Sequence, residues 1–230
     1  MKENKETKVL LFDTKDLDGA EYELFRGKAS DVRRKKADRY IREEDGKICV
    51  MAEALVRYAY LGAKGKDSMP EIVYRSGAKP YAENEEDFYF SISHAGSVIA
   101  VAYGDSETGV DIELTKRKLD RKAIADAVFT TEEKKYVFEN ADGMEERFIR
   151  LWTVKESYMK YLGKGFGKNP LTFTVDCEKG EITEIRNGRP EKLHLREFRL
   201  SDEYYMTVCG EADTVNIKYI SAEELVKSIA

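Results

Sequence analysis

The two halves of the chain carry the same order of helix-like and strand-like segments. In the first half, helical patterning over residues 31–61 precedes a hairpin within residues 88–103, which ends at Gly104. In the second half, helical segments at 132–139 and 144–162 precede strands at 194–200 and 204–210, and the last strand ends at Gly210. A repeated order of this kind predicts an α+β fold built as a pseudo-twofold duplication of two similar halves.

Apolar spacing and turn residues predict the individual elements. A break near Asp45 and Gly46 divides the first helical stretch in two, and Thr130 or Thr131 is the expected N-cap of the helix at 132–139. The expected strands lie at residues 9–13, 88–94, 98–102, 109–114, 172–176, 182–186, 194–200 and 204–210. We predict two halves, residues 1–104 and 105–230, with a ligand site in the groove between them.

Composition limits the classes of function. The 230 residues include 39 basic and 44 acidic side chains, a formal net charge of -5, so a nucleic-acid partner is not expected. No apolar run approaches the roughly 20 residues of a membrane-spanning helix, and we expect a cytoplasmic protein. With two histidines and three cysteines that form no C-x-x-C pair, any metal site would consist of carboxylates, which favours magnesium.

Two acidic residues mark the strand at 109–114. Asp111 and Glu113 stand two residues apart in the sequence Gly-Val-Asp-Ile-Glu, so their side chains point to the same face of a strand. This spacing fits either a solvated strand face or a site for a divalent cation.

A second group of charged residues lies on the helix at 144–162. Glu156 and Lys160 are one helical turn apart, which fits an ordinary ion pair on an exposed face. The apolar residues of this helix predict burial on one side, which leaves Lys155 or Glu156 free to face a groove. Trp152, the only tryptophan, is expected to anchor the core.

Further polar residues could contact phosphate groups. Ser93 and His94 end a strand at a turn, and Lys79 precedes a proline in a loop. Arg33, Lys36 and Arg39 share one broad helix face, which is either solvated or available to neutralise phosphates.

Taken together, these motifs resemble the Sfp-type 4′-phosphopantetheinyl transferases. The pattern of that family is G-x-D-x-E, followed some forty residues later by W-x-x-K-E-x-x-x-K. Both motifs are complete here, Glu156 follows Asp111 by 45 residues, and the resemblance covers roughly residues 30–219. Three departures stand out. The G-K-P loop has one extra residue before Lys79, Ile48 stands where the family often has an arginine, with Lys47 one place early, and Ser91 replaces the usual asparagine.

The resemblance implies transfer of the 4′-phosphopantetheine arm of coenzyme A to a serine of an apo acyl or peptidyl carrier protein, with release of adenosine 3′,5′-bisphosphate. It implies Mg²⁺ held by Asp111, Glu113 and Glu156. Glu156, Lys160 and His94 would act in catalysis, with Glu156 as a candidate base. Contacts to coenzyme A would come from Arg33, Lys36, Lys79, Ser93, His94, Lys155 and Lys160. A monomer is expected.

The residues leave two other functions open. Clustered carboxylates with a lysine also suit a magnesium-dependent phosphodiesterase, and a coenzyme A or carrier-binding module could retain the same residues without catalysis. For the carrier, we expect docking on the segment after Glu113, where apolar Leu119, Ala123 and Ile124 lie among Lys116, Arg117, Lys118, Arg121 and Lys122.

Overall fold

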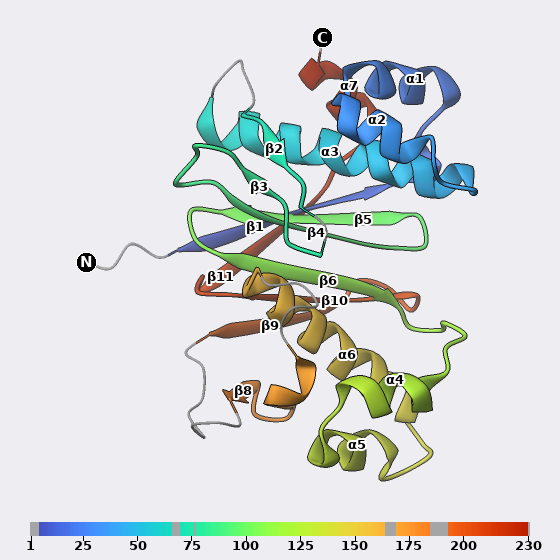
Figure 1. Ribbon diagram of the computed structural model, residues 1–230, viewed down its shortest axis with the longest axis vertical. Coiled ribbons are helices and arrows are strands. Elements are labelled where there is room, and N and C mark those ends of the chain that lie inside the picture. The colour runs from blue at the N-terminus through green and yellow to red at the C-terminus, as the bar shows by residue number, and fades with distance from the viewer. Residues whose placement is uncertain (1–4, 66–69, 76, 164–168, 185–192, 230) are drawn as a thin grey trace.

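Two β-sheets lie face to face in the molecule, and a long helix covers the outer face of each (Figure 1). The computed structural model describes residues 5–65, 70–75, 77–163, 169–184 and 193–229. Apolar side chains fill each of the three spaces between these four layers, including a central core of alternate strand residues such as Val9, Leu11, Val110 and Ile112. The alternation of side chains along each strand explains how one strand supplies two cores.

The N-terminal sheet has the strand order β11-β1-β5-β4 among the described strands. These strands are β1 (Glu6–Asp13), β4 (Tyr89–Ala95), β5 (Val98–Gly104) and β11 (Thr214–Tyr219). Strand β5 is antiparallel to β1 and β4, whereas β11 is parallel to β1. Helix α3 (Glu43–Lys64) packs on this sheet through an apolar stripe that includes Met51, Leu55 and Ala59.

The C-terminal sheet contains β6 (Thr108–Leu114), β10 (Tyr204–Gly210) and β9 (His194–Arg199), all antiparallel in that order. Helix α6 (Met144–Tyr161) packs on its outer face through Phe148, Leu151 and Val154. The predicted bounds of this helix and of strands β6, β9 and β10 agree with the structure to within one residue.

The other elements are short. They are η1 (Thr14–Asp16), α1 (Gly19–Lys28), α2 (Asp31–Ala37), β2 (Ile72–Val73), β3 (Tyr81–Ala82), α4 (Arg121–Val128), α5 (Thr131–Phe138), η3 (Pro170–Thr172), β7 (Phe173–Asp176), β8 (Glu181–Glu184) and α7 (Ala222–Ile229). Thr130 is the N-cap of α5 and forms a capping box with Glu133. The predicted strand at 182–186 extends past the described residues. No described helix is long and apolar enough to cross a membrane.

The predicted break in the first helical stretch was wrong. Helix α2 ends at Ala37 and α3 begins at Glu43, so Asp45 and Gly46 lie inside α3. A Cβ atom at Gly46 would lie 3.2 Å from the main-chain oxygen of Ala37. The glycine therefore serves the close approach of α2 to α3 and does not interrupt the helix.

The end of the chain does not pack with the half to which the predicted division after residue 104 assigns it. Strand β11 pairs with β1, and Ile220, Ala222 and Leu225 enter the core under α3. Residues 214–229 therefore complete the N-terminal half. The mixed α+β class is confirmed, and a pseudo-twofold relation between the halves stays a prediction.

Candidate active site

Strands β4 and β6 meet where the two halves join, and helix α6 crosses β6 closely. The hydroxyl of Ser91 accepts a hydrogen bond from the Val110 N–H at 3.1 Å, and the hydroxyl of Ser93 accepts one from the Ile112 N–H at 3.3 Å. A Cβ at Gly109 would overlap the main-chain oxygen of Ser157 and lie 2.5 Å from the Tyr161 nitrogen. Glycine at this position is therefore what lets α6 bring its side chains over the strand.

Three predicted residues form one hydrogen-bonded group at this junction. Lys160 Nζ lies 2.7 Å from Asp111 Oδ1 and 2.8 Å from Ser93 Oγ. The Ser93 hydroxyl in turn donates to Asp111 Oδ1 at 2.8 Å. Asp111 is 4% exposed and Ser93 is 7% exposed, so these contacts are shielded from water. The structure thus unites residues from β4, β6 and α6.

Glu113 lies on the same strand face as Asp111 and has its own partners. Trp152 Nε1 donates to Glu113 Oε1 at 3.1 Å, and Arg117 NH1 lies 3.1 Å from Oε2. Burial and the Asp111 charge raise the pKa of Glu113, and Arg117 opposes this shift. Trp152 packs against the C-terminal core, as the sequence predicted, and also holds a carboxylate.

Glu156 faces the other two carboxylates from α6. Burial raises its pKa to about 7, and the charges of Asp111 and Glu113 act in the same direction, against that of Lys160. Glu156 Oε1 and Asp111 Oδ2 are buried oxygens with no hydrogen-bond partner in the described structure. Within the described residues, no group of three or more His, Cys, Asp or Glu side chains is arranged to hold a metal ion. Free oxygens on carboxylates that repel each other nevertheless match the hard, oxygen-rich ligand set that Mg²⁺ takes while it keeps several waters.

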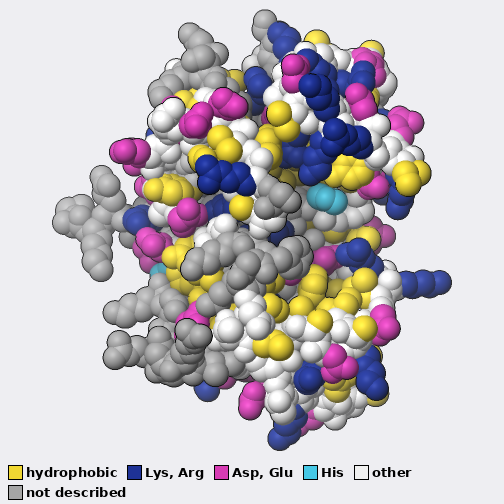
Figure 2. All heavy atoms as spheres, in the orientation of Figure 1, with side chains coloured by type: hydrophobic (Ala, Val, Ile, Leu, Met, Phe, Trp, Pro, Cys, Tyr) yellow, Lys and Arg dark blue, Asp and Glu magenta, His cyan; other side chains and the backbone are white. Residues whose placement is uncertain are grey.

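His94 lies in a groove of about 890 Å³, which is lined also by Lys15, Arg42, Asp45 and Glu113. The residue reaches solvent, but partial burial lowers the pKa of its imidazole, and the Lys160 and Lys36 charges add to this effect. Lys36 itself is exposed on α2. Figure 2 shows Lys and Arg side chains gathered on the upper half of the molecule beside a histidine. The lining of this groove is of mixed charge, with cations such as Lys15 and Arg42 and carboxylates such as Glu44 and Asp202.

Lys155 points away from the junction of the halves, so of the two residues predicted to be free on this helix, the structure supports Glu156. Its ammonium is 2.7 and 2.9 Å from the two carboxylate oxygens of Glu133 and 3.2 Å from the Phe173 oxygen. The residue is 1% exposed. Successive residues of a helix are rotated by about 100°, so a helix that turns Glu156 toward β6 turns Lys155 into the C-terminal core.

Two other cations predicted to contact phosphate are held by protein groups. The Lys79 ammonium lies 2.6 Å from Glu107 Oε2, and Arg33 is buried over the ring of Tyr74, with its Nε atom 3.9 Å from Glu53. The structure therefore does not bring either charge to Asp111. The sequence did not indicate Arg117 as a partner of Glu113, because the contact is made across the turn that follows β6 and not along a helix face.

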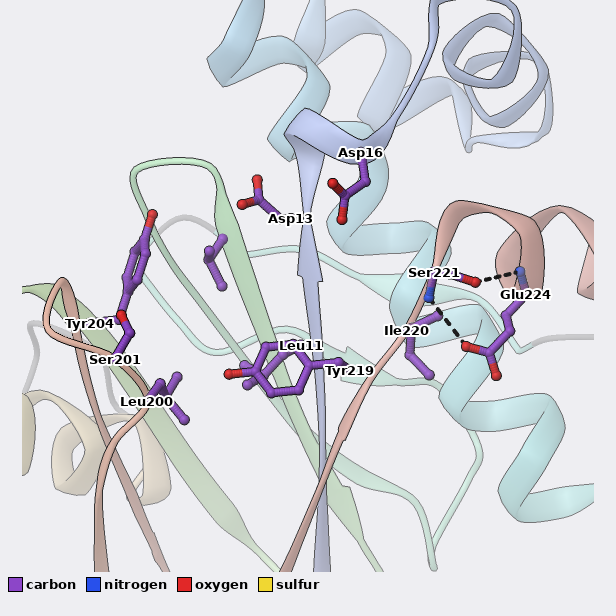
Figure 3. A pocket seen from close by; sticks show the side chains of 11 residues that line it. Leu11, Asp13, Asp16, Leu200, Ser201, Tyr204, Tyr219, Ile220, Ser221 and Glu224 are labelled. Carbon is purple, nitrogen blue, oxygen red and sulfur yellow. Dashed lines mark hydrogen bonds between the residues drawn. The ribbon is translucent and has the colours of Figure 1, made fainter.

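A smaller cavity lies next to Glu156 and Lys160. It measures about 250 Å³, and its walls include Lys79, Pro80, Ser91, Ile92, Glu156 and Met159. Another cavity of about 420 Å³ lies between the ends of β1 and β11 and the β9–β10 turn, and Asp13, Asp16, Tyr204 and Tyr219 point toward it (Figure 3). None of the predicted site residues lines this second cavity.

Comparison with known proteins identifies the class of enzyme. Residues 107–209, which contain both motifs, match the family model of the 4'-phosphopantetheinyl transferase superfamily. This match covers less than half of the chain. Together with the relatives below it bears out the resemblance, and with it the prediction of a 4′-phosphopantetheinyl transferase.

Several relatives carry that name. A 4'-phosphopantetheinyl transferase of Bacillus subtilis is 29% identical over 198 residues, which cover 84% of this chain and 87% of the relative. The transferase Sfp of Bacillus subtilis strain 168 is 27% identical, with 89% and 93% covered. AcpT of Escherichia coli K12 is 35% identical over 129 residues, 55% of this chain and 65% of AcpT. The resemblance to the Sfp-type enzymes is confirmed.

Proposed function

We propose that this protein transfers the 4′-phosphopantetheine group of coenzyme A to a serine hydroxyl of an apo acyl or peptidyl carrier protein. In this reaction the serine oxygen forms a bond to the β-phosphorus of coenzyme A. The bond from that phosphorus to the bridging pyrophosphate oxygen breaks, and adenosine 3′,5′-bisphosphate leaves. The observation that carries the proposal is the buried group of Ser93, Asp111 and Lys160 beside Glu156, where the two halves join.

The groove around His94 fits the nucleotide of coenzyme A. Arg42, Lys15 and the His94 imidazole line this groove and are available to phosphate oxygens, although carboxylates such as Glu44, Asp202 and Glu203 line it as well. Neutralisation of several phosphates needs such a set of cations. The adjoining cavity next to Glu156 and Lys160 has apolar walls from Ile92 and Met159, which suits the pantetheine arm.

Asp111, Glu113 and Glu156 are the residues that would hold Mg²⁺, with the free oxygens of Asp111 and Glu156 as donors. When bound, this ion would polarise a pyrophosphate oxygen and offset its negative charge. Magnesium dependence, a monomeric state and a cytoplasmic location remain predictions for this chain.

The protein side chains provide the proton transfers and orientation. Glu156 is proposed to accept the proton of the attacking serine hydroxyl. Lys160 is positioned by Asp111 and Ser93, so its ammonium is available beside the reacting phosphate. His94 is proposed to contact the leaving nucleotide and stabilise its charge.

Intact-mass analysis of a panel of apo carrier proteins, after incubation with this protein, coenzyme A and Mg²⁺, tests the proposal. We expect one phosphopantetheine to be added, and we expect EDTA, Asp111→Ala and Glu156→Gln each to abolish the addition in folded protein. Release of adenosine bisphosphate without a modified carrier would indicate a hydrolase. Binding of coenzyme A with neither product would indicate a binding module.

A further inference from the structure

The loop that contains Lys79 and Pro80 is a wall between two cavities. The cavity of about 250 Å³ is lined by these two residues together with Glu156 and Lys160. A neighbouring cavity of about 310 Å³ is lined by the same two loop residues together with Glu107 and the aromatic side chains of Tyr81, Phe88, Tyr89 and Phe90. The position of this loop therefore sets the shape of the space opposite Glu156 and Lys160.

A shielded ion pair connects the loop to β6. The Lys79 ammonium lies 2.6 Å from Glu107 Oε2 and donates to the Thr108 main-chain oxygen at 2.7 Å. The Lys79 side chain is 10% exposed, whereas that of Glu107 is 44% exposed. Desolvation lowers the pKa of Lys79, and the Glu107 charge opposes this shift. The lysine is therefore turned into the protein, toward the beginning of the strand that carries Asp111 and Glu113.

We propose that the Lys79–Glu107 pair anchors the loop against β6, so that Lys79 and Glu107 are positioning residues and the Lys79 ammonium is not a phosphate ligand. The link to coenzyme A rests on the proposed function. The anchor itself rests on the contacts of Lys79 with Glu107 and Thr108 and on the cavity walls. The anchor holds the loop as the wall of the pocket opposite Glu156.

The two roles of Lys79 predict opposite effects of a change at Glu107. If Lys79 anchors the loop, Glu107→Gln removes the partner of the ammonium and weakens binding of coenzyme A, as Lys79→Met does. If Lys79 binds phosphate, Glu107→Gln removes a competing negative charge, and coenzyme A binds equally well or more tightly. Asp105→Asn is the matched control, because it removes one exposed negative charge two residues away and Asp105 forms no ion pair among the described residues.

The first measurement needs no substrate. Hydrogen exchange of the backbone amides in residues 77–82 should be faster in Glu107→Gln and in Lys79→Met than in the wild type, and unchanged in Asp105→Asn. Circular dichroism and thermal unfolding will establish that each variant is folded. Unchanged exchange in both variants would overturn the anchor, whether or not the protein binds coenzyme A.

The second measurement is calorimetric titration with coenzyme A. We expect Glu107→Gln and Lys79→Met each to weaken binding about fivefold to tenfold, and the double variant to be no weaker than either single variant. Wild-type affinity or tighter binding in Glu107→Gln, with weaker binding in Lys79→Met, would overturn the proposal in favour of a phosphate ligand. Wild-type protein that binds no coenzyme A would contradict the proposed function, and the exchange result would then decide the anchor alone.

Discussion

Among the three carboxylates at the junction of the halves, the carboxylate of Glu156 has the pKa that is raised most. Its pKa of about 7 arises from burial first and from Asp111 second, and the nearby Lys160 does not compensate for them. Lys160 already donates to Asp111 and Ser93. A group arranged in this way holds excess negative charge, which a cation would relieve.

The raised pKa of Glu156 predicts how the stability of the protein depends on pH when no divalent cation is present. The folded pKa of Glu156 lies above the usual value of 4.5, so between about pH 4.5 and 7 the folded chain binds more protons than the unfolded chain. This group stabilises the fold at low pH, and that stabilisation is lost as the pH rises toward 7. Urea unfolding across this range should show the loss, and Glu156→Gln should reduce it.

Addition of Mg²⁺ at pH 7.5 is the complementary measurement. A cation that binds the folded state raises the free energy of unfolding in proportion to the logarithm of its concentration. We expect this rise in the wild type and a smaller rise in Asp111→Ala. Equal responses in the two proteins would contradict a site at these carboxylates.

Lys155 is predicted to stabilise the fold and not to bind coenzyme A. Lys155→Met leaves the buried carboxylate of Glu133 without its cation, so we expect a loss of about 3–5 kcal/mol in urea unfolding. The double variant Lys155→Met/Glu133→Gln should recover part of this loss. A stable Lys155→Met protein with a clearly raised KM for coenzyme A would instead support the phosphate contact.

Among the elements, the crossing of α6 over β6 depends on one glycine. Ser157 and Tyr161 of α6 present main-chain atoms where a side chain at residue 109 would lie. The same crossing brings the Lys160 ammonium within 2.7 Å of Asp111 Oδ1. The first glycine of G-x-D-x-E therefore has a packing role, distinct from the chemistry of the two carboxylates.

Gly109→Ala should accordingly destabilise the protein by about 1–3 kcal/mol or more and reduce transfer activity in the protein that remains folded. Gly62→Ala is the control, because Gly62 lies in α3 with open space around it. That change should raise stability by up to about 1 kcal/mol. Thermal unfolding and transfer rates measure both, and a Gly109→Ala protein with wild-type stability would show that α6 can shift without cost.

The whole molecule presents a basic surface next to the groove, after β6. Two of its arginines have partners within the protein, since Arg117 binds Glu113 and Arg121 lies 2.9 Å from Glu145. Lys118 and Lys122 are exposed, and no ion pair involves them in the part of the chain that the structure describes. These two lysines are therefore the better candidates to contact an acidic carrier protein.

Charge reversal at Lys118 and Lys122 should raise the KM for an acidic carrier about tenfold and leave the KM for coenzyme A unchanged. Lys227→Glu, an exposed change on α7, is the control. The difference in carrier KM between the Lys118/Lys122 variant and the wild type should become smaller as the salt concentration rises. An unchanged carrier KM at low salt would exclude this surface as the docking site.

Local patterns in the sequence predicted much of the fold and part of the site. The period of apolar residues identified α6 and most strands, and the G-x-D-x-E and K-E-x-x-x-K spacings identified Asp111, Glu113, Glu156 and Lys160. Helices α1, α4 and α7 and strand β11 were missed. The moderately apolar face of α1 gave a weak signal, and β11 is an edge strand whose parallel pairing with β1 joins opposite ends of the chain.

The sequence by itself determined the α+β class and singled out the carboxylates that we propose to bind a cation, because helix and strand periods and motif spacing are properties of neighbouring residues. Only the tertiary structure decided which positive charges face the site. Glu133 and Glu107 hold Lys155 and Lys79, and Arg33 lies over Tyr74 with Glu53 3.9 Å from its Nε atom. These carboxylates lie 20 to 28 residues away in the sequence, and a buried ammonium or guanidinium turns toward the carboxylate that compensates its charge, wherever the fold places that partner.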